Sequence, residues 1–239
     1  TVTTSYNTAL GYNAGAAVST GTNNTLIGGL AGDALTTASS NVAIGTSALT
    51  SATTAGDNVA IGYASMYNTT TGGLNTAVGR QTMNANTIGV SNAAFGHQAL
   101  YSNTTASQNS AFGRNALFAN STGANNTAVG YNSLSANTTG TQNTALGTFA
   151  LDAITTGNYN IAIGTNAVGT ATTASNNVGV GVQALYNSTG SSNVAVGTTA
   201  MNANTTGSSS VAVGNNALAA NTVGGSNVAI GAAALDSNT

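Results

Sequence analysis

The sequence repeats one short motif every 17 residues along most of its 239 residues, and this period limits the possible folds more than any other feature. A fixed period of this kind is typical of a solenoid, in which each repeat forms one coil and buries its apolar face against its neighbours. We therefore expect residues 1–239 to form a single repeat array, as a segment of a longer chain. The motif Asn-x-Ala-Val-Gly, with small variations, begins at Asn7, Asn24, Asn41, Asn58, Asn75, Asn92, Asn109, Asn126, Asn143, Asn160, Asn177, Asn193, Ser210 and Asn227.

Positions 1 to 5 of the repeat, counted from this Asn, predict a short β-strand. They are rich in β-branched residues and are bounded by Asn and Gly, as in Asn41-Val42-Ala43-Ile44-Gly45. Because side chains alternate along a strand, positions 3 and 5 form a face of Ala and Gly, and positions 2 and 4 form a bulkier face. One coil cannot cover both faces of its own strand, so we expect the bulkier face to pack against sister copies of the chain.

The remaining positions predict the return path of each coil. Positions 7 to 10, as in Ala48-Leu49 and Ala99-Leu100, suggest a return strand, with a single helical turn as the alternative. Positions 11 to 16, as in Asn137-Thr138-Thr139-Gly140, are turn residues, because Asn tolerates left-handed backbone and Gly adopts positive φ without strain. Stacked coils would align the Asn of position 1 into a hydrogen-bonded ladder. The predicted fold is all-β, a parallel β-roll or β-solenoid of about fourteen 17-residue coils.

The composition argues against several classes of function. Only 3% of the residues are charged, the net charge is −2, and there is no Lys, Glu, Pro or Cys. Nucleic-acid binding requires clustered basic side chains, structural zinc sites require Cys or several His, and a membrane span requires a long apolar run. We therefore expect no nucleic-acid partner, no metal and no insertion of this segment into a membrane.

Catalytic chemistry also lacks its usual residues. General acid–base catalysis needs paired carboxylates or a positioned His, whereas the Asp residues fall in different repeats. The stretch from Gly179 to Ala184 matches a dinucleotide fingerprint, but the same window recurs as the repeat itself and no βαβ unit surrounds it. We therefore expect neither an enzyme nor a bound cofactor. The acid–base residues are Asp33, Asp57, Asp152, Asp236 and His97.

One group of side chains departs from the repeat pattern. Position 6 holds unusual residues in five consecutive repeats, and stacking would align them in a column; aromatic residues at position 10 would lie nearby. We predict a surface-binding stripe for sugars or an anionic partner, with cationic donors and aromatic faces. The alternatives are a solvated stripe, or stacking between chains that locks an oligomer. The stripe comprises Tyr63, Arg80, His97, Arg114 and Tyr131 at position 6, and Tyr67, Tyr101 and Phe118 at position 10.

The strand motif also carries a resemblance to known proteins. Strands such as Asn193-Val194-Ala195-Val196-Gly197 resemble the head repeats of YadA-type trimeric autotransporter adhesins, and the longer repeat is similar to those of phage tail-fibre proteins. The resemblance implies a left-handed parallel β-roll, three chains per fibre, and an extracellular location at a cell surface or on a virion fibre. The period of 17 is longer than that of the best-known heads.

The sequence therefore favours a structural and adhesive segment of an extracellular homotrimeric fibre. Such a segment would provide length and rigidity, and could contact a glycan or protein on a host surface. Two other functions are open at this stage. One is a self-assembling extracellular filament subunit, and the other is an ice-binding solenoid, although most Thr residues here fall in the predicted turns rather than on a strand face.

Overall fold

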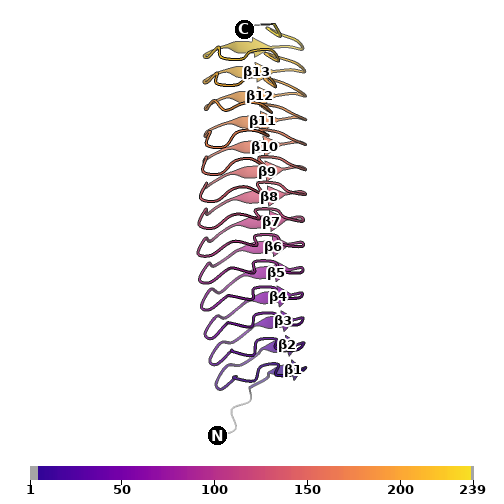
Figure 1. Cartoon of the computed structure of the whole chain (residues 1–239), viewed down its shortest axis with the longest axis vertical. Helices are drawn as coiled ribbons and strands as arrows, with labels where there is room; N and C mark the ends of the chain where they lie inside the picture. The colour runs from indigo at the N-terminus through magenta and orange to yellow at the C-terminus, as the bar shows by residue number, and fades with distance from the viewer. Residues whose placement is uncertain (1–4, 238–239) are drawn as a thin grey trace. The chain divides into compact units, whose positions relative to one another are not determined.

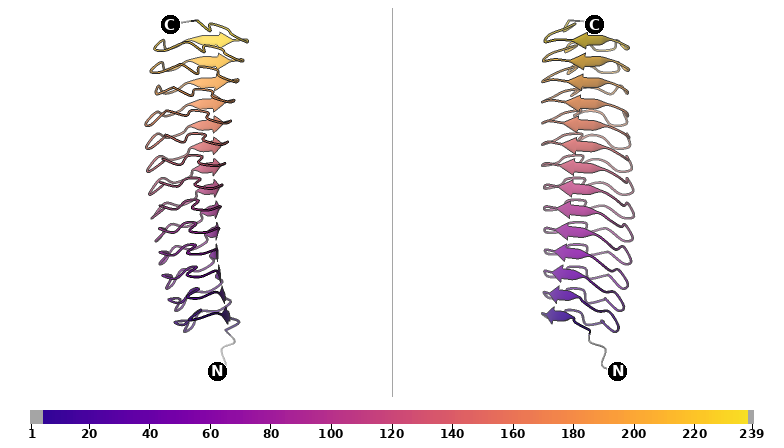
Figure 2. Two further views of the ribbon diagram at one scale, coloured as in Figure 1. Left: turned by 45° about the vertical axis from the view of Figure 1, so that its right-hand side comes forward. Right: turned by 180° about the vertical axis from the view of Figure 1, so that it is seen from behind.

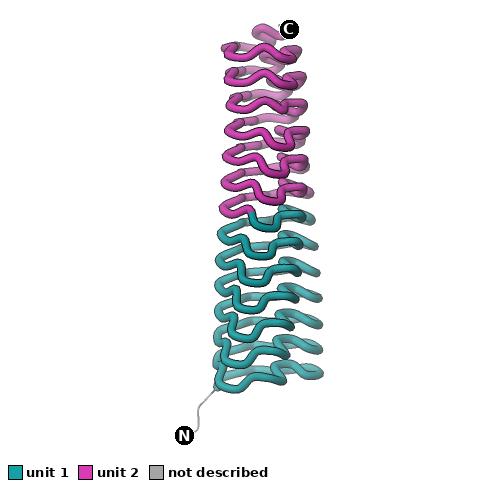
Figure 3. The backbone as a smooth tube through the Cα atoms, turned by 60° about the vertical axis from the view of Figure 1, so that its left-hand side comes forward, with its two compact units in different colours: residues 1–122 teal, residues 123–239 magenta. Residues whose placement is uncertain are grey.

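The computed structural model describes residues 5–237 and contains fourteen β-strands and no helix in that range (Figure 1). The chain is divided into two compact units, residues 1–122 and residues 123–239, shown in teal and magenta in Figure 3. Each unit has seven strands, one per coil, and consecutive strands pair in parallel. The prediction of an all-β parallel solenoid is confirmed.

The strands of both units occupy the same three positions of the repeat. Within unit 1, for example, Ala43 pairs with Ala60, and within unit 2 Ala195 pairs with Ala212. Figure 2 shows the strands of each unit as one layer and the return segments of the coils as a second layer. In unit 1 the strands are β1 (Thr8–Leu10), β2 (Thr25–Ile27), β3 (Val42–Ile44), β4 (Val59–Ile61), β5 (Thr76–Val78), β6 (Ala93–Phe95) and β7 (Ser110–Phe112). In unit 2 they are β8 (Thr127–Val129), β9 (Thr144–Leu146), β10 (Ile161–Ile163), β11 (Val178–Val180), β12 (Val194–Val196), β13 (Val211–Val213) and β14 (Val228–Ile230).

Each strand covers positions 2 to 4, three residues where the sequence predicts about five, because the Gly at position 5 ends it. Gly45, for example, has a φ of 131°, which L side chains rarely adopt. A Cβ on Gly45 would lie 2.6 Å from the carbonyl oxygen of Gly62 in the next coil. Both the backbone angle and the close approach of the next coil therefore require Gly, which explains its presence in all fourteen repeats.

The predicted return strand at positions 7 to 10 is wrong, and the helical turn offered as its alternative is also absent from the described residues. Positions 7 and 9 are left-handed instead, as in Ser47 (φ 56°) and Leu49 (φ 54°). Ala48 and Leu49 are adjacent and both fully buried, which the alternation of a strand does not allow. The left-handed residues turn both side chains inward while the backbone still bonds between coils, since Leu49 N–H donates to the Ser65 carbonyl at 3.0 Å.

The core lies between the two layers and is built from position 3 on the strand and positions 8 and 9 on the return segment. In most coils a buried Ala at position 3 faces a buried Leu or Met at position 9. The second coil reverses this pairing, because Leu26 occupies position 3 while Gly32 occupies position 9, and the coil before it also has a Gly, Gly15, at position 9. A Cβ on Gly15 would lie 2.7 Å from a methyl group of Leu26, and a Cβ on Gly32 would lie 2.8 Å from Leu26 and 2.7 Å from Leu35, so Leu26, together with Leu35, fills the space that the two Gly residues leave.

The Asn residues of position 1 form the predicted ladder inside each unit. The Asn24 Oδ1 accepts hydrogen bonds from the backbone N–H of Asn41 at 3.0 Å and from Asn41 Nδ2 at 3.1 Å. Asn41 Nδ2 also donates to the Ala55 carbonyl of its own coil at 2.9 Å. Each side chain thus links neighbouring coils and also joins the two layers of one coil. A buried amide is stable in this setting because its donors and acceptors are satisfied.

A second Asn ladder at position 12 corrects the prediction for the Asn-Thr-Thr-Gly segment. Asn103 is fully buried, and its Nδ2 donates to Asn86 Oδ1 at 2.8 Å and to the Ala106 carbonyl at 3.0 Å. The position-12 Asn residues are not left-handed, and neither are the Gly residues at position 15, such as Gly140. The left-handed residue of this corner is at position 17, as in Ser40 (φ 61°). These Asn residues therefore serve the core rather than the turn.

The single 16-residue coil, residues 177–192, shows which position can be removed. Asn177 Nδ2 still donates to the carbonyl of Gly190 at 2.9 Å, although 13 residues rather than 14 separate the two. The missing residue falls at position 14, where other coils have an exposed residue such as Thr71 or Thr206. The coil therefore shortens at an exposed corner without losing its internal hydrogen bond.

Candidate binding surface

The outward face of the strands is partly exposed in both units. Its position 4 is apolar in every coil, whereas its position 2 is apolar in eight coils and Thr or Ser in the other six. The Ala of position 3 is buried, whereas the side chains of positions 2 and 4 point away from the core. In unit 2 this face exposes Leu146 by 45%, and Ile163, Val196 and Val213 by more than a third. Among residues 5–237, the return segments pack on the other side of the strands and leave this face uncovered.

The two Phe residues of this face form a feature that the sequence prediction missed. Phe95 and Phe112 lie on neighbouring strands of unit 1, with stacked rings whose centroids are 5.0 Å apart. Their exposed fractions are 36% and 39%. Sequence reasoning treated them only as apolar members of position 4, although their occurrence in adjacent repeats was a visible signal.

The position-6 residues of unit 1 form a column at the corner where each strand ends. We call Tyr63, Arg80, His97 and Arg114 the position-6 column. The Arg80 guanidinium carbon lies 5.7 Å from the centre of the Tyr63 ring, within cation–π range. Arg80 Nη1 donates a long hydrogen bond of 3.4 Å to His97 Nε2. The structure therefore brings together three of these residues, from three consecutive coils, as stacking predicted.

Arg114 continues this column in the next coil, and its side chain is exposed. Arg80 is exposed as well, and His97 is half-buried. No Asp or Glu occurs in the sequence between Asp57 and Asp152, so no carboxylate is contributed by the coils that carry the two Arg residues. The local charge at this corner of unit 1 is positive.

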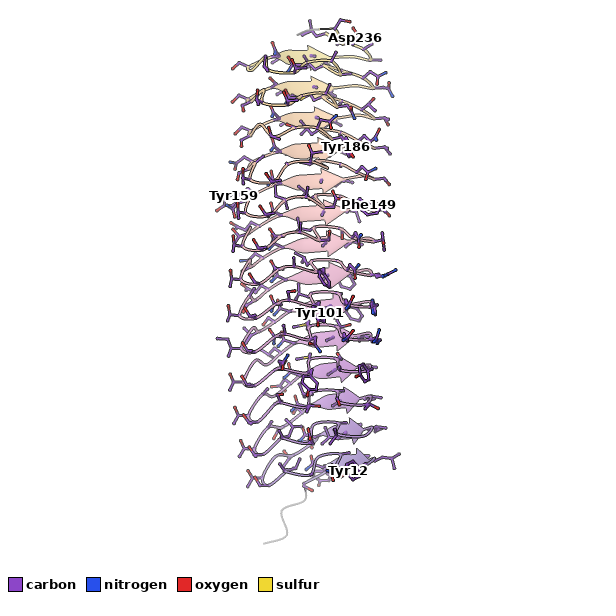
Figure 4. The ribbon with its side chains drawn as sticks, viewed as in Figure 1. Tyr12, Tyr101, Phe149, Tyr159, Tyr186 and Asp236 are labelled. Atoms are coloured by element: carbon purple, nitrogen blue, oxygen red, sulfur yellow. The ribbon has the colours of Figure 1, made fainter. Side chains whose placement is uncertain are left out.

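The other predicted stripe residues lie in separate groups. Tyr101 and Phe118 at position 10 stack on each other with centroids 5.3 Å apart, and Tyr67 at the same position is exposed. Along each coil, the inward-facing residues at positions 8 and 9 lie between these rings and the position-6 column. Tyr131 belongs to unit 2, where its ring meets Phe149 edge-on. Figure 4 places Phe149 and Tyr159 at opposite edges of unit 2.

The acidic side chains do not form a site in the described part of the chain. Burial raises the pKa of the Asp152 carboxyl above its ordinary value, opposed by hydrogen bonds from the backbone N–H groups of Asp152 and Ala153. Asp33 occupies the same repeat position, and its Oδ1 is buried without a hydrogen-bond partner. Among residues 5–237, no three His, Cys, Asp or Glu side chains are close enough to bind a metal ion. The same range contains no helix that combines the length and apolarity of a membrane span.

The Thr residues of position 13 form a ladder through their hydroxyl groups. Thr87 Oγ1 donates to the carbonyl of Thr104 in the next coil at 2.9 Å, and Thr138 Oγ1 donates to the carbonyl of Thr155 at 3.0 Å. These hydroxyl protons are therefore engaged within the fold. They lie in the return segment and not on the strand face, as the sequence predicted.

Comparison with protein-family models and with curated proteins finds no match for this sequence.

Proposed function

We propose that this chain is a structural and adhesive segment of an extracellular homotrimeric fibre, as in the YadA-type heads and phage tail fibres whose repeats it resembles. The observation that supports the proposal is the apolar outward face of the strands. Exposed apolar surfaces of this extent usually mark an interface. The face recurs in every coil of each unit, so a partner that covers it must present an equally long surface, and a sister chain does so.

A closed symmetric assembly explains how such a face can be covered without uncontrolled aggregation. Homo-oligomers usually close around a symmetry axis, which uses the same surface of every subunit. In a trimer the strand faces of three chains meet around the axis, with Phe95 and Phe112 in the shared core. The corners at positions 6 and 14, where most residues are polar, remain outside and keep the assembly soluble.

Two matched variants test this arrangement. Val196→Lys with Val213→Lys places two charges on the strand face of adjacent coils. Thr206→Lys with Val223→Lys places the same two charges at the exposed position 14 of the same coils. Sedimentation equilibrium should give three times the chain mass of 23.0 kDa for the wild type and the position-14 variant, and the monomer mass for the strand-face variant. Circular dichroism should show that all three proteins remain folded.

Other outcomes would decide against the proposal. A wild-type protein that stays monomeric at high concentration would contradict it. Open-ended growth of the wild type would favour the filament function, and thermal hysteresis in freezing water would favour ice binding.

A further inference from the structure

Every Arg residue of the chain and its only His occur in three consecutive coils of unit 1, at the same repeat position. In most other coils position 6 holds a small or neutral residue, such as Thr46 or Thr148. Arg80 and Arg114 lie two coils apart with His97 between them, so both positive charges of the chain's side chains fall on one exposed corner. An anion that lies along the column would meet both of them.

We propose that the position-6 column of unit 1 binds an acidic polysaccharide that lies along the stacking direction of the coils. This inference rests on the proposed adhesive function and names the class of ligand. Neighbouring strands are about 4.8 Å apart, so the column offers one side chain for each such step. A sugar unit of an extended polysaccharide has a similar length, so successive sugars can meet successive coils.

The chemistry of the column fits an anionic sugar. The Arg80 guanidinium lies over the Tyr63 ring and contacts His97, which limits its motion and orients its remaining N–H groups. Arg binds carboxylate and sulfate oxygens through charge-assisted hydrogen bonds, with a planar set of donors. Tyr63 is 52% exposed and offers part of an aromatic face on which the C–H face of a sugar can pack.

The position of the column also suits a ligand rather than the trimer interface. Position 6 follows the Gly that ends each strand, and so lies at the corner and not on the apolar strand face. In the proposed trimer this corner stays open to solvent. A nucleic acid is less suitable, since its affinity requires many basic contacts and this chain has two Arg residues, no Lys and a net charge of −2.

The test compares three proteins that differ in whether the two Arg residues are present and in where they lie. The first is the wild type, and the second is Arg80→Thr with Arg114→Thr, which introduces a residue found at position 6 in other coils. The third adds Thr71→Arg and Thr105→Arg to these two changes. It restores the net charge and the spacing of two coils, but at the exposed position 14, away from Tyr63 and His97.

Binding is measured by calorimetry with heparin, alginate, neutral dextran and a single-stranded oligonucleotide. We expect the wild type to bind heparin or alginate but not dextran, and both variants to bind about tenfold or more weakly. Preference for heparin or for alginate distinguishes a sulfated from a carboxylated ligand. Binding should weaken as salt is raised, because the column is exposed. Tyr63→Thr should reduce affinity by about two- to fivefold, since it removes the ring beneath Arg80.

The following results would overturn the inference. Equal binding by the relocated variant would show that any pair of Arg residues suffices. Tighter binding of the oligonucleotide than of either polysaccharide, or no binding of either polysaccharide by the wild type, would also reject it. Sedimentation of the same proteins separates this result from the proposed function, because the Arg variants should keep the wild-type mass.

Discussion

The Gly of position 5 is the residue on which the stacking of coils depends most directly. Its positive φ and its contact with the next Gly leave no room for a Cβ. We predict that Gly45→Ala lowers the free energy of unfolding by about 3 kcal/mol or more, through strained backbone and a clash with Gly62. Urea denaturation followed by circular dichroism measures the change.

Gly29→Ala is the matched control for this prediction. Gly29 lies at position 6 and an added Cβ would meet no atom within 4 Å. The control should change stability by less than about 0.5 kcal/mol. Similar losses from both substitutions would show that position 5 has no special role.

Asp152 allows a prediction about pH. Burial raises the pKa of its carboxyl in the folded state, so the folded protein holds the proton more tightly than the unfolded chain does. Asp152 therefore lowers the free energy of unfolding as the pH rises through the unfolded-state pKa, near 3.9. The lost stability is not regained at neutral pH. Below that range the protonated side chain carries no such penalty.

Asn at the same position shows what Asp152 lacks. Asn84 Nδ2 donates to the Ala64 carbonyl of the previous coil at 3.0 Å, and Thr50 Oγ1 donates to the Leu30 carbonyl at 3.1 Å. Asp152→Asn should gain the equivalent bond, to the Asn132 carbonyl. We predict a stabilisation of about 1 kcal/mol at pH 7 that shrinks below about pH 4. Thermal unfolding at several pH values measures the stabilisation, and Asp57→Asn, at an exposed position, is the control. A stabilisation of equal size at pH 3 would show that it does not come from removing the buried charge of Asp152.

At the scale of one coil, the strand and its return segment share a fixed core volume. Leu26 with Gly15 and Gly32 shows that position 3 can be large when position 9 is small. We predict that Ala60→Leu and Met66→Gly each destabilise the fold by about 1–3 kcal/mol or more, the first through overpacking and the second through a cavity and a flexible backbone.

The double variant should be less destabilised than the sum of the two single changes. The coupling should be about 1 kcal/mol or more, measured by a double-mutant cycle in urea. Ala94→Leu combined with Met66→Gly is the control, because Ala94 lies two coils further along and the two changes should be additive. Additive behaviour in the first pair would mean that positions 3 and 9 do not share volume.

The strand half of the coil was predictable and the return half was not. The period, the strand position, the inward Ala and the position-1 ladder all follow from side-chain alternation and from the repeat itself. The return segment could not be predicted, because residues such as Leu49 and Met66 are left-handed although their side chains disfavour that conformation. Only contacts with neighbouring coils hold them there, and such contacts are not visible in one repeat.

The binding surface was predictable to a similar degree. The column of Tyr63, Arg80 and His97 follows from the equal spacing of the repeats. The separation of the position-10 rings from that column depends on the left-handed return segment, and so could not be foreseen. Asn103 and its equivalents were assigned to a turn because the composition Asn-Thr-Thr-Gly is typical of turns; their burial depends on the same unexpected backbone.

At the scale of the whole molecule, different surfaces are proposed for different tasks. The apolar strand faces are assigned to sister chains, and the charged corner of unit 1 to an external ligand. The first interaction depends on apolar burial and the second on exposed charge, so salt should affect the second far more than the first. A chain with so few charges can concentrate its electrostatic field at one place.

The hydrogen bonding between coils has a consequence for how such a protein can change over time. Within each unit every coil presents the same main-chain groups to the coil before it and the coil after it, and these bonds do not depend on which residues fill the outward positions. An in-frame duplication or loss of one repeat in the gene would therefore join compatible neighbours. The reach of the protein can evolve by copy number, while the outward residues of any single copy diverge to recognise new ligands.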